Sequence, residues 1–99
     1  MLTLPIKKKW FDMILSGEKK EEYREIKPYY DSRFDFKDDG EFKTYSSQRK
    51  IILRNGYSKN SQSILCDVVI TKGYGRKDWG AEPNKMYYVL KILSVERLI

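Results

Sequence analysis

The sequence predicts a small α+β domain in which one N-terminal helix accompanies a run of β-strands. Apolar residues recur at helical spacing over residues 6–16, and alternating or continuous apolar segments follow between turn-forming residues. The chain has 99 residues, enough for one hydrophobic core. Because long polar loops separate the predicted strands, we expect a small barrel with the helix at one end, forming one domain over residues 1–99.

Composition favours an anionic partner. The chain carries 20 Lys and Arg against 14 Asp and Glu, a net charge of +6. The N-terminal residues lack the order of a secretion signal, and no apolar run approaches the roughly 20 residues of a membrane span. A single cysteine, Cys66, agrees with a reducing compartment. We therefore expect a cytoplasmic protein without membrane association.

The residue types also limit the chemistry. The chain has no histidine and one cysteine, which excludes a Ser-His-Asp triad, a Cys-His pair and the ordinary zinc sites. Any catalysis must then use Lys, Glu, Asp, Tyr, Ser or Thr side chains. We expect no metal ion and no cofactor.

The N-terminal segment predicts a short strand and then a helix. Residues 2–4 are extended because Pro5 restricts the residue before it, and we expect Pro5 to end the strand. Pro5 can then open an amphipathic helix over residues 6–16, which Gly17 ends. The three lysines of residues 7–9 oppose the helix dipole, so they form either a solvated first turn or a place for an anion.

The segment after Gly17 predicts a turn and a strand, although its Glu, Lys and Arg residues are good helix formers. Residues 20–26 can alternate between two faces of a strand. On that pattern Glu22 and Arg24 project to the same side and can pair with each other or with one ligand. Lys19 can join them only from the turn or from a bulge.

The second half predicts a short helix and three strands. Pro28 opens the helix over residues 28–34, and the charged residues 35–48 predict a long mobile loop. Strands are expected over residues 49–53, 64–71 and 86–95, joined by loops over residues 54–63 and 73–85. The near-continuous apolar run of residues 64–71 predicts a central strand, with Cys66 as a packed hydrophobic residue.

A motif after the helix resembles that of a known family. The pattern GxKxxExR is made by Gly17, Lys19, Glu22 and Arg24. With the preceding helix, it resembles the ASCH domain, a small PUA-like β-barrel group. Two later segments resemble parts of its small phage-type and prokaryotic members: residues 54–57 (Arg-Asn-Gly-Tyr) and 79–83 (Trp-Gly-Ala-Glu-Pro). The resemblance covers most of the chain and is weakest over residues 31–48.

The resemblance implies a PUA-like barrel with a charged cleft that binds RNA, a nucleotide or a modified nucleoside. Arg24 would hold a phosphate or a base edge, Glu22 would accept from an exocyclic amine or fix Arg24, and Lys19 would face phosphate. From the residues alone, the alternative is a strand with exposed ion pairs, each worth roughly 0.2–1 kcal/mol.

An enzymatic alternative stays open. Some small ASCH-like proteins resemble amidohydrolases acting on N4-acetylcytidine, with a lysine, a threonine three residues later and a distant glutamate. Lys19 matches the lysine, Glu22 stands at the threonine position, and Glu82 is a candidate for the glutamate. A carboxylate beside Lys19 favours its protonated form, which opposes its use as a base. The other enzymatic possibility is a metal-independent ribonuclease with Glu22 as base and Arg24 or Lys19 on the phosphate.

Arg54, Asn55 and Tyr57 form a second candidate set. The Asn-Gly pair is a hairpin turn signal that needs no other function. Alternatively, Asn55 reads a base edge and Tyr57 stacks on the base.

Arg76, Lys77 and Trp79 form a third candidate set, in a glycine-rich loop that lacks the Walker pattern. Trp79 is either a lid residue or a core plug, and we favour the lid. A protein-interaction role is a further function class, which predicts indifference to changes at residues 19–24.

Overall fold

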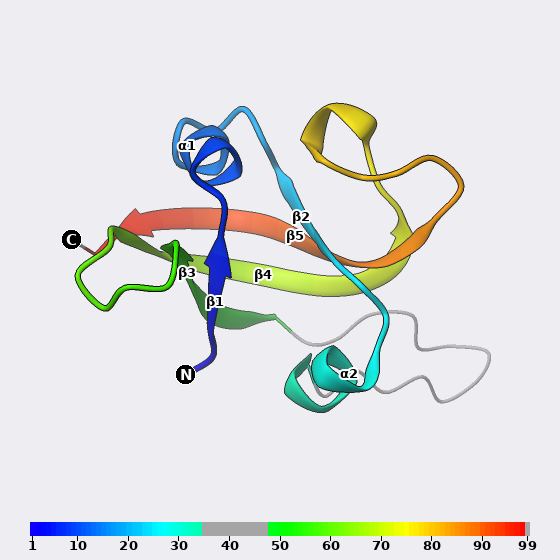
Figure 1. The fold of residues 1–99 in the computed structure, drawn as a ribbon, viewed down its shortest axis with the longest axis horizontal. Coiled ribbons are helices and arrows are strands. Elements are labelled where there is room, and N and C mark those ends of the chain that lie inside the picture. The colour runs from blue at the N-terminus through cyan, green and yellow to red at the C-terminus, as the bar shows by residue number, and fades with distance from the viewer. Residues whose placement is uncertain (35–47, 99) are drawn as a thin grey trace.

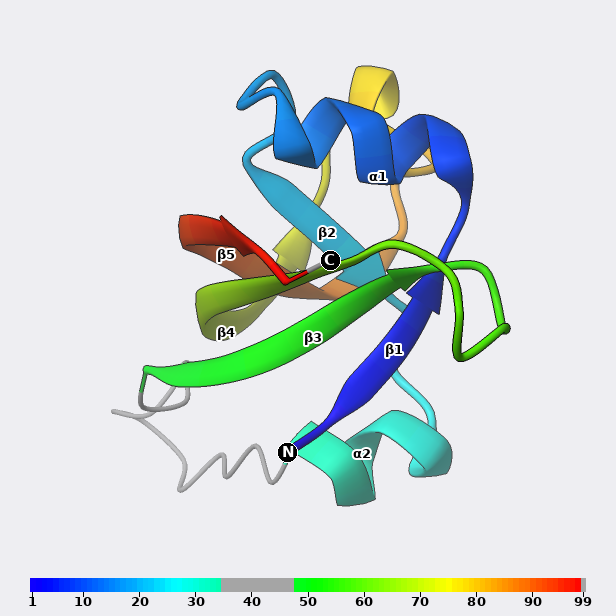
Figure 2. The same ribbon diagram turned by 90° about the vertical axis from the view of Figure 1, so that its left-hand side faces the viewer.

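The computed structural model describes residues 1–34 and 48–98, which form an α+β fold (Figures 1 and 2). In chain order its elements are β1 (Thr3–Ile6), α1 (Lys8–Leu15), β2 (Glu21–Arg24), α2 (Pro28–Phe34), β3 (Arg49–Asn55), β4 (Ser63–Tyr74), the 3-10 helix η1 (Lys77–Trp79) and β5 (Met86–Arg97). The long loop expected over residues 35–48 lies outside the described residues, apart from Gln48.

The strands form one mixed sheet in the order β1-β3-β4-β5-β2. β1 pairs with β3 in parallel, and the other neighbours are antiparallel. The sheet curls into a half-barrel, with α1 on one side of its concave face and α2 on the other (Figure 2). β4 lies in the middle of the sheet, as its apolar sequence predicts, while β1 and β2 are the two edge strands.

The prediction that Pro5 ends the first strand and opens the helix is wrong. β1 runs through Pro5 to Ile6, with Pro5 opposite Arg54, and α1 begins at Lys8. A proline is tolerated there because β1 is an edge strand and needs hydrogen bonds on one side only. The predicted end of the helix is confirmed, since Gly17 follows α1 with a φ of 88°.

The predicted strand after Gly17 is confirmed as β2, and the short helix after it as α2, which begins at Pro28. Arg49 fixes the end of that helix, because its Nη1 donates to the Phe34 carbonyl oxygen at 2.9 Å. The strands β3, β4 and β5 each extend beyond their predicted ranges.

The core lies between the concave face of the sheet and the two helices. Its buried residues are Leu4, Ile6, Phe11, Ile14, Phe34, Ile51, Leu53, Ile64, Cys66, Val68, Ile70, Tyr88 and Leu90. α1 contributes Phe11 and Ile14, and α2 contributes Phe34, whose ring packs edge-on against Tyr88 at 5.1 Å between centroids. The Tyr88 hydroxyl also donates to Asp31 of α2, which fixes this helix to β5. No helix of the described ranges is long and apolar enough to span a bilayer.

We expect the Cys66 thiol to resist alkylation in the folded protein. Its side chain is 0% exposed, and burial, with the charges of Asp67 and Glu22, raises its pKa to about 12. Iodoacetamide at a pH of about 9, above an ordinary thiol pKa of about 8.5, should therefore label Cys66 only after denaturation. Mass spectrometry with and without urea checks this, and equal labelling rates would contradict the burial.

Candidate functional site

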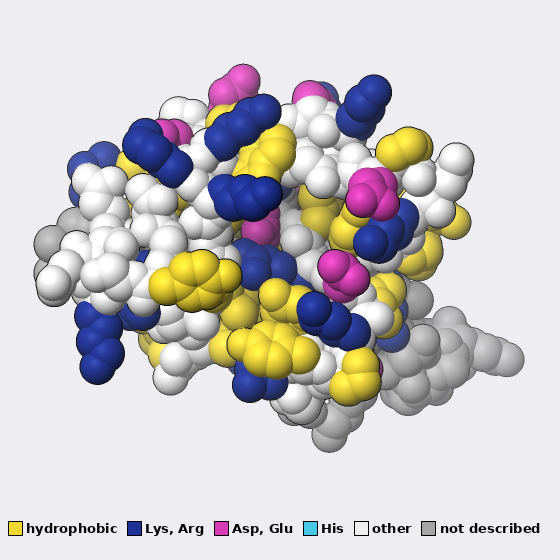
Figure 3. Space-filling view, in the orientation of Figure 1, with side chains coloured by type: hydrophobic (Ala, Val, Ile, Leu, Met, Phe, Trp, Pro, Cys, Tyr) yellow, Lys and Arg dark blue, Asp and Glu magenta, His cyan; other side chains and the backbone are white. Residues whose placement is uncertain are grey.

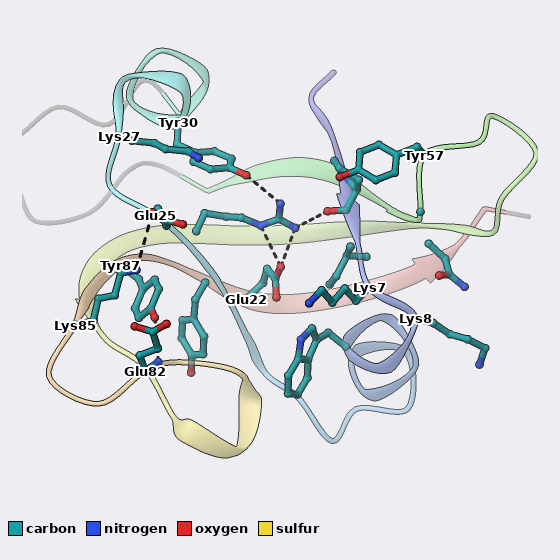
Figure 4. Close-up of a pocket in the computed structure, with 17 residues that line it drawn as sticks. Lys7, Lys8, Glu22, Glu25, Lys27, Tyr30, Tyr57, Glu82, Lys85 and Tyr87 are labelled. Carbon is teal, nitrogen blue, oxygen red and sulfur yellow. Dashed lines mark hydrogen bonds and ion pairs between the residues drawn. The ribbon is translucent and has the colours of Figure 1, made fainter.

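A pocket of about 650 Å³ opens where the two edge strands of the half-barrel approach each other (Figure 4). β1 contributes Pro5 and Ile6, and β2 contributes Glu22, Tyr23 and Arg24. The other lining residues are Lys7, Lys8, Trp10, Glu25, Lys27, Tyr30, Asn55, Gly56, Tyr57, Glu82, Lys85 and Tyr87. The pocket therefore draws on segments from both ends of the chain.

Arg24 ties the walls of the pocket together. Its Nε donates to Glu22 Oε2 at 3.1 Å, and its Nη2 lies 2.8 Å from the same oxygen. Its Nη2 also donates to the Pro5 carbonyl oxygen at 2.8 Å, and its Nη1 donates to the Tyr30 hydroxyl at 3.2 Å. One guanidinium thus joins β2 to β1 and to α2. The predicted projection of Glu22 and Arg24 to one side is confirmed.

Lys19 joins this pair from the turn before β2, as the spacing predicts. Its Nζ lies 3.3 Å from Glu22 Oε1 and donates to the Trp79 carbonyl oxygen at 2.7 Å. The rings of Trp10 and Tyr23 lie 5.2 and 4.8 Å from the ammonium. Lys19 is 1% exposed and Glu22 is 6% exposed, so these are not the exposed ion pairs of the alternative interpretation.

Burial and Glu22 act in opposite directions on Lys19. Glu22 acts to raise the pKa of Lys19, as expected of a neighbouring carboxylate, but burial lowers the pKa by more, so the net shift is downward. At Arg24 the balance is reversed, because burial acts to lower the pKa, but Glu22 and Tyr30 together raise it above the ordinary value. The pocket therefore keeps a fixed positive charge at Arg24.

The Glu22–Arg24 pair retains hydrogen-bonding capacity. Among the described residues, Nη1 of Arg24 contacts only the Tyr30 hydroxyl, which leaves one of its two hydrogens for another acceptor. Glu22 Oε1 is contacted by Lys19 alone, so it can accept from a further donor. Since both side chains line the pocket, its floor offers one donor and one acceptor.

The rim of the pocket combines cations with aromatic rings. The cations are Lys7, Lys8, Lys27 and Lys85, and the rings are Trp10, Tyr23, Tyr30, Tyr57 and Tyr87. Tyr57 is 88% exposed, which leaves both faces of its ring open to a partner. Figure 3 shows Lys and Arg side chains alternating with hydrophobic ones across this face of the molecule.

The structure divides the residues predicted to form the site. Glu22, Arg24, Asn55, Tyr57 and Glu82 line the pocket. Lys19 lies behind its wall, against Glu22. The residues outside the lining are Arg54, Arg76, Lys77 and Trp79.

The four predicted residues outside the lining have other surroundings. Arg54 lies on β3, and its buried Nε has no hydrogen-bond partner in the described part of the chain. Arg76 lies over the Trp79 ring at 4.3 Å and pairs with Asp78 at 2.9 Å. Lys77 is exposed at the start of η1. Trp79 is half-buried, and its carbonyl oxygen accepts from Lys19.

The loop between β4 and β5 supports the pocket wall from outside. The Tyr23 hydroxyl accepts from the Arg76 N–H at 2.9 Å and donates to Glu21 at 2.9 Å. Gly75 lies directly against the Tyr23 ring, so close that no larger residue fits there. This contact holds Tyr23, a lining residue, in place. No metal-binding cluster of acidic or cysteine residues occurs among residues 1–34 and 48–98.

Sequence reasoning missed most of the rim. Apart from Tyr57, which was predicted to stack on a base, Lys7 and Lys8 carried a signal, namely three lysines at the start of a helix, where cations are unfavourable. Lys27 and Lys85 carried none, because they enter the pocket through the packing of α2 and the pairing of β5. Comparison of the chain with protein families, with curated proteins and with solved structures finds no match.

Proposed function

We propose that this chain is an ASCH-type, PUA-like domain that binds RNA or a nucleotide in the pocket between β1 and β2. The observation that carries the proposal is the buried Glu22–Arg24 pair at the floor of a pocket rimmed by lysines and aromatic rings. The half-barrel with its N-terminal helix and the GxKxxExR motif support it. Three residues of the motif, Lys19, Glu22 and Arg24, form one cluster of ion pairs.

The chemistry of the pocket fits a nucleotide in three respects. The remaining donor of Arg24 and the remaining acceptor of Glu22 can each bond to a polar group of a nucleotide. The exposed ring of Tyr57 and the ring of Trp10, both in the lining, offer stacking surfaces, worth roughly 1–3 kcal/mol per base. The rim lysines supply charges for phosphate.

A titration tests the proposal. Short single-stranded RNA and cytidine nucleotides are added at two salt concentrations while tryptophan fluorescence is followed, since Trp10 lines the pocket. We expect binding that weakens with salt. Glu22→Gln should weaken it by about tenfold or more, because an amide cannot replace a charged acceptor.

Glu96→Gln is the matched control, since Glu96 is exposed on β5 outside the pocket. Its affinity should equal that of the unchanged protein. The proposal fails if neither RNA nor nucleotides bind, or if the Glu22 and Glu96 variants bind equally well.

Amide hydrolysis is a second candidate, favoured by the lowered pKa of Lys19 and by the presence of Glu82 in the same pocket as Glu22. The position of Lys19 counts against it, because its ammonium lies behind the wall and is bonded to Glu22 and to the Trp79 carbonyl oxygen. Incubation with N4-acetylcytidine should release no cytidine. Release that is lost in Lys19→Met would assign the chain to the hydrolases, and cleavage of the titrated RNA would indicate a ribonuclease.

A further inference from the structure

The pocket has two ends that differ in charge. Lys7 and Lys8 lie at the α1 end, while Lys27 and Lys85 lie at the opposite end, with Glu22 between them (Figure 4). Figures 1 and 2 agree in placing α1 and α2 on opposite sides of this opening. A ligand that fills the pocket therefore touches both ends.

The α1 end is basic. Lys7 has no acidic partner in the described part of the chain, and no acidic residue lines the pocket at this end. Lys8 pairs with Asp12 at 2.6 Å, but that pair is exposed and Asp12 lies outside the pocket. Figure 4 shows the Lys8 side chain pointing away from the pocket, so it reaches a bound anion only by turning, which its weak, exposed pair with Asp12 permits.

The α2 end is balanced. Two carboxylates, Glu25 and Glu82, line the pocket together with Lys27 and Lys85. Lys85 lies 4.0 Å from Glu25 and 5.3 Å from the Tyr87 ring, and Lys27 lies 5.6 Å from the Tyr30 ring. An anion entering this end meets two like charges as well as the two lysines and gains no net attraction, whereas a hydroxyl group meets two strong acceptors.

We infer that the pocket selects a nucleotide with a single phosphate, bound at Lys7 and Lys8, whose hydroxyl end lies against Glu25 and Glu82. The inference rests on the proposed function and adds the direction in which the ligand lies. A phosphate carries about −1.5 to −2 charges near neutral pH, so a second phosphate gains no net attraction at the balanced end. The ligand is then a free mononucleotide or the terminal nucleotide of a strand. The pocket of about 650 Å³ falls within the roughly 300–1,000 Å³ of small-molecule sites.

Calorimetry with four cytidine compounds tests this direction: the nucleoside, its 5′-monophosphate, its 3′-monophosphate and its 3′,5′-bisphosphate. We expect one monophosphate to bind about tenfold more tightly than the nucleoside. The bisphosphate should bind no more tightly than that monophosphate. A bisphosphate that binds most tightly overturns the inference, yet leaves the proposed function standing if binding still depends on Glu22. If neither the four compounds nor RNA bind, both the inference and the proposed function are wrong.

Two double variants test which end of the pocket binds the phosphate. Lys7→Ala with Lys8→Ala should remove the gain in affinity of the monophosphate over the nucleoside. The control, Lys59→Ala with Lys91→Ala, removes equal charge from exposed positions outside the pocket and should retain that gain. Glu25→Gln with Glu82→Gln should raise the affinity for bisphosphate relative to monophosphate by roughly tenfold. An unchanged ratio overturns the inference.

A strand end is distinguished from a free nucleotide by one further comparison. An oligonucleotide whose end carries a hydroxyl should bind more tightly than the same strand with that end phosphorylated. Equal affinity of the two strands, with the expected preference among the mononucleotides, assigns the pocket to the free nucleotide.

Discussion

Replacement of Glu22 by alanine is expected to lower the free energy of unfolding by about 3–5 kcal/mol. The variant leaves Lys19 and Arg24 buried without the carboxylate that contacts them at 3.3 and 2.8 Å. Urea unfolding followed by tryptophan fluorescence measures the loss. Because small domains are stable by roughly 5–15 kcal/mol in total, this variant has little margin left. Binding is for that reason tested with Glu22→Gln, which keeps the shape of the side chain.

A double variant separates the loss of the ion pairs from the loss of packing. Lys19→Met with Glu22→Gln removes both charges, so it should cost less than the sum of the two single changes. Glu96→Ala, at an exposed position of β5, should change stability by less than about 0.5 kcal/mol. A loss below about 1 kcal/mol in Glu22→Ala is typical of surface pairs and would contradict the burial of this cluster.

Replacement of Gly75 by alanine is expected to cost about 1–3 kcal/mol and to release the loop between β4 and β5. A Cβ atom at this position would lie 2.6 Å from the Tyr23 ring and 2.6 Å from the Ala81 Cβ, closer than such atoms approach in proteins. Tyr23 must then move, which breaks its hydrogen bond with the Arg76 N–H. Urea unfolding measures the loss in the free energy of unfolding, and limited proteolysis measures how readily the loop between β4 and β5 is cleaved.

Gly73→Ala is the matched control for this prediction. The nearest atom to a Cβ at Gly73 is Val89 Cγ2 at 4.0 Å, an ordinary contact. We expect its stability to stay within about 0.5 kcal/mol of the unchanged protein, with the loop as resistant to proteolysis as before. Equal losses in both variants would mean that the backbone, and not the contact with Tyr23, makes glycine necessary at position 75.

The parts of the site that the sequence predicts are those fixed by local spacing. Glu22 and Arg24 share a face because residues two apart in a strand always do, and Lys19 reaches them because a turn follows Gly17. The elements around them follow from the same local signals. Pro5 is the exception, since its effect depends on whether its strand lies at an edge or in the middle of the sheet.

Long-range packing determines the parts of the site that the sequence does not predict. Lysine is among the residues least often buried. The residue type therefore gives no reason to expect that Lys19 is 1% exposed or that its pKa is lowered. Lys7, Lys27 and Lys85 are far apart in the chain and line one pocket only because β1 and β2 become opposite edges of one curled sheet. Neither periodicity nor motif reports that curvature.

The hydrogen bond between Arg24 and the Pro5 carbonyl oxygen also bears on association between copies of the chain. An open sheet edge invites a strand from another molecule, and this leads to aggregation. At position 5 the β1 edge has no N–H to offer, because the residue is proline, and its carbonyl oxygen is already taken at 2.8 Å. Arg24, which shapes the pocket, thus also closes position 5 of this edge to pairing with a strand from another molecule.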